Sequence, residues 1–231
     1  MEDEITLPKH LGFIVDGNRR WAKLRNLPTM SGHMKGLAVV EELAVDIIKR
    51  GIPFASFYIF SNENWGRSEK EVNYLMDMTR KNLDRLAKRF KKENIKCVLM
   101  GRKEPIADDI WAQILHAEEI TKDCTGGTIG LCFNYGGKQE IADAMTKILA
   151  ENPGKTEVSV EEIEQNIYHP EVPSCDYIVR TSGEQRISGF MLWRAAYAEF
   201  CFYEKLFPDL KPEDLDNILE DYASRQRRYG K

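Results

Sequence analysis

The sequence predicts an α/β fold, with a single domain over residues 1–231 built on a six-stranded, mainly parallel sheet surrounded by helices. Short apolar runs of strand character alternate with helix-length segments along the chain. A hydrophobic content of 42% beside 30% charged residues is typical of a soluble globule with a core. At 231 residues the chain can form one sizeable α/β domain without a second.

Six runs are expected to be strands, because each is short and rich in β-branched or aromatic residues. Strands joined by helix-length segments form right-handed crossovers, so both faces of the sheet should be covered. The runs are Leu11–Val15, Ala55–Phe60, Ile95–Met100, Thr128–Asn134, Tyr177–Arg180 and Glu199–Tyr203.

Four helices are expected from apolar residues at helical spacing and from their end signals. Gly51 and Pro53 end the first, and Ser68-Glu69-Lys70-Glu71 has the form of a capping box that opens the second. Asn152-Pro153-Gly154 reads as a loop. The expected helices are 37–48, 68–90, Lys138–Ala150 and Pro212–Arg228.

The composition argues against several classes of protein. A formal net charge of −4 is unlike that of nucleic-acid-binding proteins, which are usually basic. The five cysteines form no CxxC pair, and Cys97 and Cys132 fall in apolar runs, so we expect reduced thiols in a cytoplasmic protein. We expect no secretory signal and no membrane-spanning helix, although peripheral contact with a membrane stays open.

A polar cluster follows the first expected strand. The apolar run Leu11–Val15 ends at Asp16-Gly17-Asn18-Arg19-Arg20-Trp21. A carboxylate can hold a divalent cation, a glycine lets backbone approach a ligand, and guanidinium groups bind phosphate oxygens in pairs. The cluster therefore predicts a site for a metal-bound polyphosphate at the carboxyl end of this strand.

Three more strand ends carry polar groups. In a parallel sheet the carboxyl ends of the strands share one edge, so segments far apart in sequence converge there. Together the four ends supply several arginines and small hydroxyl groups, which are enough donors for two phosphate-bearing ligands. The three segments are Ser61–Arg67, Tyr135–Lys138 and Arg180–Ser188.

Each of these features also has a purely structural interpretation. Asp16-Gly17-Asn18 could form an ordinary turn, and arginines are usually solvated. His33, at a helix start, could be a structural residue, and the tryptophans could serve packing. A nucleotide-binding loop is a competing explanation, but neither GxGxxG nor GxxxxGK[ST] occurs.

The motifs resemble those of the cis-prenyltransferases, the undecaprenyl diphosphate synthase-like isoprenyl transferases, over nearly the whole chain. More than five motifs occur in the family's order, which makes chance agreement implausible. They are His10–Ala22, Gly32-His33, Phe60–Trp65, Asn134–Gly137, Arg180–Ser188, Leu192-Trp193, Ala196–Glu199, Phe207–Asp209 and Arg227–Gly230.

The resemblance implies a fold and an activity. The fold is a homodimer in which a hydrophobic tunnel between sheet and helices holds the growing chain. The activity is repeated condensation of isopentenyl diphosphate onto an allylic diphosphate primer, such as farnesyl or geranylgeranyl diphosphate, with cis double bonds and Mg²⁺. Each added unit buries roughly four or five carbons at ~0.8 kcal/mol per methylene, so transient membrane contact would help release the product.

The resemblance also assigns roles to residues. Asp16 and Glu199 are implied to bind the metal, and Asn64 to assist proton removal. Isopentenyl diphosphate is assigned to Arg180, Arg186, Ser188 and the tail Arg228-Tyr229-Gly230, which resembles an RxG element that completes the site across the dimer. The other substrate-binding residues implied are Gly17, Asn18, Arg19, Arg20, Trp21, His33, Ser61, Asn62, Glu63, Trp65, Arg67 and Ile187.

Three positions depart from the family pattern. Arg19 stands where many bacterial members have glycine, which adds a cation. Thr29 stands where they have arginine, which removes one diphosphate contact. Gln185 stands where some relatives carry a histidine associated with the metal, so Gln185 is left out of the metal set.

An active enzyme is predicted in preference to two other classes of protein. A non-catalytic partner subunit of this fold would have lost motif residues such as Asp16 and Asn64. A generic nucleotide-binding protein would carry a phosphate loop. Strand alternation places Ile59 on the same face as Ser61, where it would shorten the product by narrowing the cavity; ordinary sheet packing is the alternative.

Overall fold

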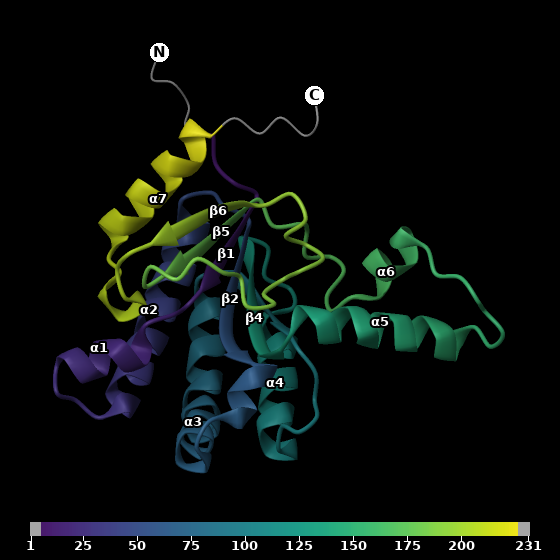
Figure 1. Ribbon diagram of the computed structural model, residues 1–231, viewed down its shortest axis with the longest axis horizontal. Helices are drawn as coiled ribbons and strands as arrows, with labels where there is room; N and C mark the ends of the chain where they lie inside the picture. Colours follow the sequence, from purple (N-terminus) through teal and green to yellow (C-terminus); the bar gives the residue numbers. More distant parts are fainter. Residues whose placement is uncertain (1–5, 226–231) are drawn as a thin grey trace.

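A six-stranded sheet forms the centre of the computed structural model, which describes residues 6–225 (Figure 1). Its order is β3-β4-β2-β1-β5-β6, and every neighbouring pair is parallel. The predicted six-stranded sheet is therefore confirmed, and it is parallel throughout. The strands are β1 (His10–Ile14), β2 (Phe54–Ser61), β3 (Ile95–Met100), β4 (Gly127–Tyr135), β5 (Tyr177–Thr181) and β6 (Glu199–Tyr203).

Seven helices and two short 3-10 turns lie within the described residues. Three of the helices were not predicted, namely α1, α4 and α6. The full set is α1 (Asn18–Leu24), α2 (Thr29–Lys49), η1 (Asn62–Gly66), α3 (Glu69–Lys92), α4 (Asp108–Thr121), α5 (Gly137–Glu151), α6 (Val160–Asn166), η2 (Phe207–Asp209) and α7 (Pro212–Ser224).

Two predicted helix ends and one predicted cap were wrong. The first helix was expected over 37–48, but α2 already begins at Thr29. The last helix was expected to reach Arg228, but α7 ends at Ser224 because Arg225 adopts an extended conformation. Ser68 precedes α3 as predicted, yet its side chain makes no capping hydrogen bond. The carboxylate of Glu71, which a capping box would turn back to Ser68, instead contacts His33 and Arg67.

The two faces of the sheet are covered differently. Apolar residues of α2, α3, α4 and α7 pack on one face, together with side chains such as Phe13 and Phe57. The opposite face carries Tyr58 and Ile178 and is covered by the segment 167–198 and the first turns of α5. We call these the helix-covered face and the loop-covered face. In Figure 1, α1, α2 and α7 lie left of the strands, and α5 and α6 lie right of them.

The strand order reverses at β1. The connection after β1 leads to β2 on one side, whereas β5 and then β6 continue on the other side. In open parallel sheets, ligands bind outside the carboxyl ends of the strands at such a reversal. The predicted polar cluster follows β1, and Arg180 lies near the end of β5, so the fold brings both to this crevice. No helix of the described part of the chain is long and apolar enough to cross a membrane.

The regular alternation of β2 breaks near its end. The pairing of β2 with β4 shifts register between Tyr58 and Phe60, which indicates a β-bulge at Ile59. Phe60 consequently packs with Phe57 on the helix-covered face rather than with Tyr58. The alternation argument for Ile59 was therefore wrong, although Ile59 does line the cavity beside Ser61.

Candidate active site

Asp16 and Arg180 meet at the crevice between β1 and β5. Arg180 Nη2 donates to Asp16 Oδ2 at 2.8 Å, and the Thr181 hydroxyl donates to the Asp16 carbonyl at 2.7 Å. Arg180 is only 4% exposed, whereas the Asp16 side chain is about one-third exposed and lines the cavity. A buried guanidinium thus holds a carboxylate at the mouth of the crevice.

The rest of the Arg180 guanidinium is held by the loop that follows β5. Its Nη1 donates to the Ser188 hydroxyl at 2.7 Å and to the Arg186 carbonyl at 2.5 Å. Its Nε is buried and has no hydrogen-bond partner within residues 6–225. A buried donor without a partner is a point at which an anionic ligand could bind.

Gly17 and Asn18 form the turn from β1 into α1. Gly17 has a φ of 108°, and a Cβ there would lie 3.1 Å from the Leu206 backbone, so only glycine fits. Asn18 begins α1, and its carbonyl packs directly on Gly32 of α2. Asn18 Oδ1 is buried without a hydrogen-bond partner among the described residues. The turn therefore presents the amino end of α1 to the cavity.

Arg20 connects α1 to the loop after β5. It donates to the Ser182 carbonyl at 3.2 Å and to the Ser182 hydroxyl, and it lies 3.3 Å from the Glu184 carboxylate. Arg19, one residue earlier, is 62% exposed on the rim of the cavity. Both arginines line the cavity.

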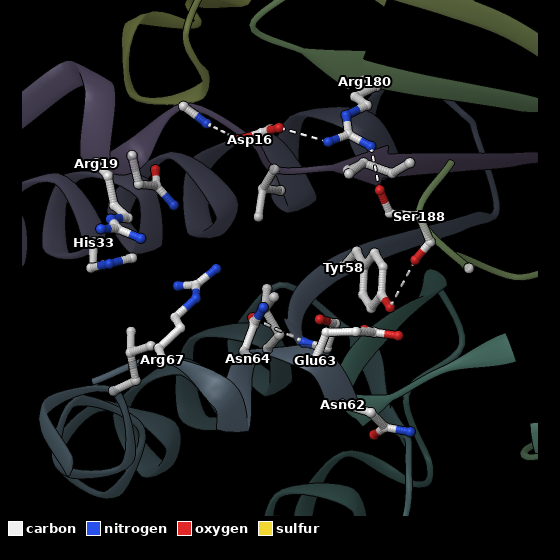
Figure 2. A pocket seen from close by; sticks show the side chains of 18 of the residues that line it. Asp16, Arg19, His33, Tyr58, Asn62, Glu63, Asn64, Arg67, Arg180 and Ser188 are labelled. Atoms are coloured by element: carbon white, nitrogen blue, oxygen red, sulfur yellow. Dashed lines mark hydrogen bonds and ion pairs between the residues drawn. The ribbon is translucent and has the colours of Figure 1, made fainter. Parts of the chain in front are cut away.

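The opposite wall follows β2. Asn64 Oδ1 accepts a hydrogen bond from the Ser61 backbone N–H at 3.1 Å, which leaves its amide nitrogen directed to the cavity side of the turn. Asn62 and Glu63 line the same wall (Figure 2). Trp65 is directed away from the cavity, because its indole N–H donates to Asn134 Oδ1 at 2.8 Å.

A buried carboxylate that the sequence analysis missed as a site residue organises the third wall. Glu71 Oε1 accepts from Arg67 Nη1 at 2.9 Å and lies 3.3 Å from His33 Nε2. Burial lowers the pKa of His33, and the nearby Arg67 charge lowers it further, so the ring is neutral at neutral pH. The only signal in the sequence was the i, i+4 spacing of Arg67 and Glu71.

These three walls enclose a cavity of about 1200 Å³ (Figure 2). Six basic side chains line it against two carboxylates, so the cavity carries an excess of positive charge on a chain whose net charge is −4. Lys23 and Lys138 are lining residues that were not predicted, although Lys138 follows a predicted strand end. The basic residues are Arg19, Arg20, Lys23, Arg67, Lys138 and Arg180, and the carboxylates are Asp16 and Glu63.

A smaller apolar chamber of about 80 Å³ adjoins the cavity. Val15, Ile59 and Leu75 line both spaces, so the two lie side by side. The walls of the chamber come from α2, α3 and the helix-covered face of the sheet, and include Val40, Leu83 and Phe133. A cavity lined by basic side chains therefore adjoins an apolar chamber.

Five predicted site residues do not line the cavity. Trp21 donates to Asp209 at 2.7 Å, Arg186 is 60% exposed and pairs with Glu184, and Ile187 packs on the loop-covered face. Trp65 holds the turn after β2, as described above. The fifth is Glu199, and the tail Arg228-Tyr229-Gly230 lies outside the described residues.

Glu199 lies at the other end of the sheet from Asp16. It begins β6, pairs in register with Tyr177, and its carboxylate accepts from Arg225 at 3.1 Å. Tyr177 in turn pairs with Leu11, five residues before Asp16, which corresponds to about 16 Å along the strands. Within one chain, Glu199 and Asp16 are therefore too far apart to hold the same ion.

The cavity nevertheless suits a magnesium ion that is bound mainly by its substrates. Within residues 6–225, no group of three or more His, Cys, Asp or Glu side chains could hold a metal alone. Mg²⁺ in phosphate-transfer sites usually takes one or two carboxylates, several waters and the substrate phosphates. Asp16, with its carboxylate on the cavity wall, meets that requirement.

Comparisons with known proteins identify the family of this chain. Residues 14–230 match the family described as "Putative undecaprenyl diphosphate synthase". An isoprenyl transferase of Rickettsia bellii is 43% identical over 96% of this chain and 98% of its own length. A decaprenyl diphosphate synthase of Mycobacterium tuberculosis is 41% identical over 97% of this chain and 77% of its own length.

Two solved structures share the fold. Lavandulyl diphosphate synthase from Lavandula x intermedia, in complex with dimethylallyl diphosphate, superposes with a TM-score of 0.90 at 30% identity, covering 97% of this chain and 99% of that one. A probable undecaprenyl diphosphate synthase from Campylobacter jejuni gives 0.82 at 28% identity over 98% and 100% of the two chains. The chain therefore belongs to the undecaprenyl diphosphate synthase family, and it is a prenyl-transferring enzyme.

Proposed function

We propose that this enzyme condenses isopentenyl diphosphate repeatedly onto an allylic diphosphate, with each new double bond cis, to give a polyprenyl diphosphate. The observation that carries the proposal is the junction of the basic cavity with the apolar chamber. The charged head of a prenyl diphosphate would lie in the first and its hydrocarbon in the second. Relatives named decaprenyl diphosphate synthase and isoprenyl transferase support this assignment.

Two groups of donors support two diphosphates. Arg180 and Ser188 lie beside β5, and we assign them to isopentenyl diphosphate. His33 and Arg67 lie across the cavity, and we assign them with Arg19 and Arg20 to the allylic diphosphate. The related structure that contains dimethylallyl diphosphate supports an allylic substrate.

The chemistry needs charge stabilisation and protection from water. Loss of diphosphate from the allylic substrate develops negative charge on the leaving group, which the arginines stabilise electrostatically. Magnesium bound by Asp16 and the substrate phosphates would add to that stabilisation. We assign to Asn64, whose Oδ1 accepts from the Ser61 backbone N–H, the role of assisting loss of a proton from the cation that forms on condensation.

The chamber is too small to hold a long hydrocarbon chain in its present shape. At about 80 Å³ it is smaller than the ~150 Å³ cavity that holds a benzene molecule. A chain of several isoprene units would therefore enter only as the side chains between α2 and α3 move apart. We propose that the tunnel of this enzyme is opened by its own product.

The remaining proposals concern assembly. A homodimer would allow the carboxy-terminal tail to complete the isopentenyl site of a partner, and a partner chain would also be needed if Glu199 is to reach a metal. Deleting residues 228–231 should then raise the KM for isopentenyl diphosphate about tenfold and leave that for the primer unchanged. Unchanged KM values for both substrates would show that the tail takes no part in binding isopentenyl diphosphate. We also propose that the product leaves by transient contact between a cytoplasmic enzyme and a membrane.

The decisive experiment is a direct assay. Purified protein is incubated with labelled isopentenyl diphosphate and Mg²⁺, with dimethylallyl, farnesyl or geranylgeranyl diphosphate as primer, and products are separated by chain length. Polyprenyl diphosphates that disappear with EDTA are the expected result. No product from any primer would reject the proposal and favour a non-catalytic partner subunit.

A further inference from the structure

Glu71 connects three residues of the proposed primer site. Its Oε1 accepts from Arg67 Nη1 at 2.9 Å and lies 3.3 Å from His33 Nε2. Its Oε2 lies 3.9 Å from Arg19 Nη1. The partners come from α1, from α2 and from the turn before α3, so one carboxylate ties three elements together. Glu71 is 6% exposed and lies behind the residues that line the cavity.

A carboxylate at this position fixes groups that would otherwise be mobile. Arginine has a long side chain, and ordering it when a ligand binds reduces affinity. Glu71 holds Arg67 by one nitrogen, and the guanidinium is directed into the open cavity (Figure 2). The same oxygen makes Nε2 the proton-bearing nitrogen of neutral His33, which sets the ring's orientation.

The geometry points to Glu71 as the positioning residue of the allylic diphosphate site: it orders Arg67 and His33 before the primer binds, without touching the primer itself. This inference rests on the proposed function, because it concerns the diphosphate that His33 and Arg67 would bind. It also explains why the Glu71 carboxylate does not turn back to the backbone N–H of Ser68, as the expected capping box requires.

The chain contains a matched control. Glu41 is another buried carboxylate between α2 and α3, and it accepts from Arg85 at 2.6 Å and from Arg89 at 3.0 Å. None of these three residues lines the cavity. A variant at Glu41 therefore removes a comparable buried carboxylate between the same helices while leaving the proposed site intact.

The test compares Glu71→Gln with Glu71→Ala. Both variants remove the charge, but glutamine keeps an oxygen where Oε1 accepts from Arg67 and His33. We expect the KM for farnesyl diphosphate to be about tenfold higher in Glu71→Ala than in Glu71→Gln, with the KM for isopentenyl diphosphate alike in the two. Glu41→Ala and Glu41→Gln should not differ in either constant.

Two outcomes would overturn the inference. Equal primer constants in the two Glu71 variants would show that no positioning takes place, and a parallel rise for both substrates would show a general structural role. Glu71→Leu, which fills similar space without an acceptor, replaces Glu71→Ala if that variant does not fold.

A binding measurement keeps the inference separate from the proposed function. Calorimetry with inorganic pyrophosphate needs no catalysis, and we expect Glu71→Gln to bind it about tenfold more tightly than Glu71→Ala. An inactive protein that shows this difference would reject the proposed reaction but keep the role of Glu71. An active protein in which the two variants bind pyrophosphate equally well would keep the proposed reaction but reject the role of Glu71.

Discussion

The helix-covered and loop-covered faces of the sheet are closed by different means. On the first, α2, α3, α4 and α7 pack through apolar side chains. On the second, polar side chains tie the segment 167–198 down. Arg194, 2% exposed, donates to Glu140 at 2.6 Å and to the carbonyls of Val172 at 3.2 Å and His169 at 3.0 Å.

The difference follows from how backbone groups are satisfied. A helix bonds its own N–H and C=O groups, so its contact surface can be entirely apolar, and a gap between two helices is tolerated. A buried loop has carbonyls that need partners, and those partners fix it in place. The hollow chamber lies on the helix-covered face, and the network of polar side chains lies on the other. We therefore expect substitutions around the cavity and chamber to change activity, and substitutions in the polar network to change the free energy of unfolding.

The largest effect on activity is expected at the edge of the sheet, where the cavity opens. Asp16→Asn keeps an oxygen facing Arg180 but removes the charge that a metal requires. Turnover should fall by roughly two to four orders of magnitude, while the free energy of unfolding changes little. Steady-state kinetics and urea unfolding on the same preparation check both statements; near-normal turnover would remove Asp16 from the mechanism.

The largest effect on stability is expected on the loop-covered face. Arg194→Met leaves Glu140 buried without its partner and frees several carbonyls, so the free energy of unfolding should drop by about 3–5 kcal/mol. Arg85→Met, at an exposed position on the helix-covered side, should change it by less than about 1 kcal/mol. Equal losses in urea unfolding would contradict the distinction between the faces.

A smaller effect is expected from pH. Burial lowers the pKa of His10 to about 4, with a further contribution from the Arg194 charge. Below about pH 6.5, His10 is therefore protonated in the unfolded chain but stays neutral in the folded one. The contribution of neutral His10 to the free energy of unfolding is complete above pH 6.5 and declines as the pH falls toward 4. The difference between 6.5 and 4 corresponds to about 3 kcal/mol.

Unfolding measured from pH 7 to pH 4 checks this prediction. His10→Gln should flatten the decline, since glutamine does not titrate. A decline that persists in His10→Gln would assign it to other groups.

The smallest effect is expected in the chamber. Ile59 lines both the cavity and the chamber, so Ile59→Ala should widen their junction and shift products to longer chains. Ile178→Ala, the same truncation on the loop-covered face, should leave the distribution unchanged. Chromatography of the products decides it: identical profiles for Ile59→Ala and wild type would show that Ile59 only packs the sheet.

Much of the fold was predictable because the strands are local in sequence. All six were located, and β3 and β6 to the residue, since buried parallel strands are short runs of apolar residues between breaks. The helices α1 and α6 have seven residues each, too few to show a period. The α4 stripe was obscured because Leu115 is exposed and Thr121 is buried.

The site was predictable only in part. Residues next to strand ends, such as Asp16 and Arg180, follow from the rule that carboxyl ends converge. Glu71 does not, because its partners come from other elements and its local pattern matches a cap just as well. Glu199 shows the reverse case: a motif assigned it to the metal, but within one chain the register of β6 places it at the other end of the sheet from Asp16.

Ser188 carries a consequence for attempts to make this enzyme more heat-resistant. Its φ of 49° is left-handed, which typically disfavours a residue with a Cβ by about 1–2 kcal/mol and leaves glycine unaffected. A search guided by stability alone would therefore choose glycine here, as the chain itself does at Gly189. The hydroxyl that receives Arg180 would then be lost. Ser188 therefore keeps a backbone conformation that glycine would adopt more easily, together with the hydroxyl that accepts from Arg180.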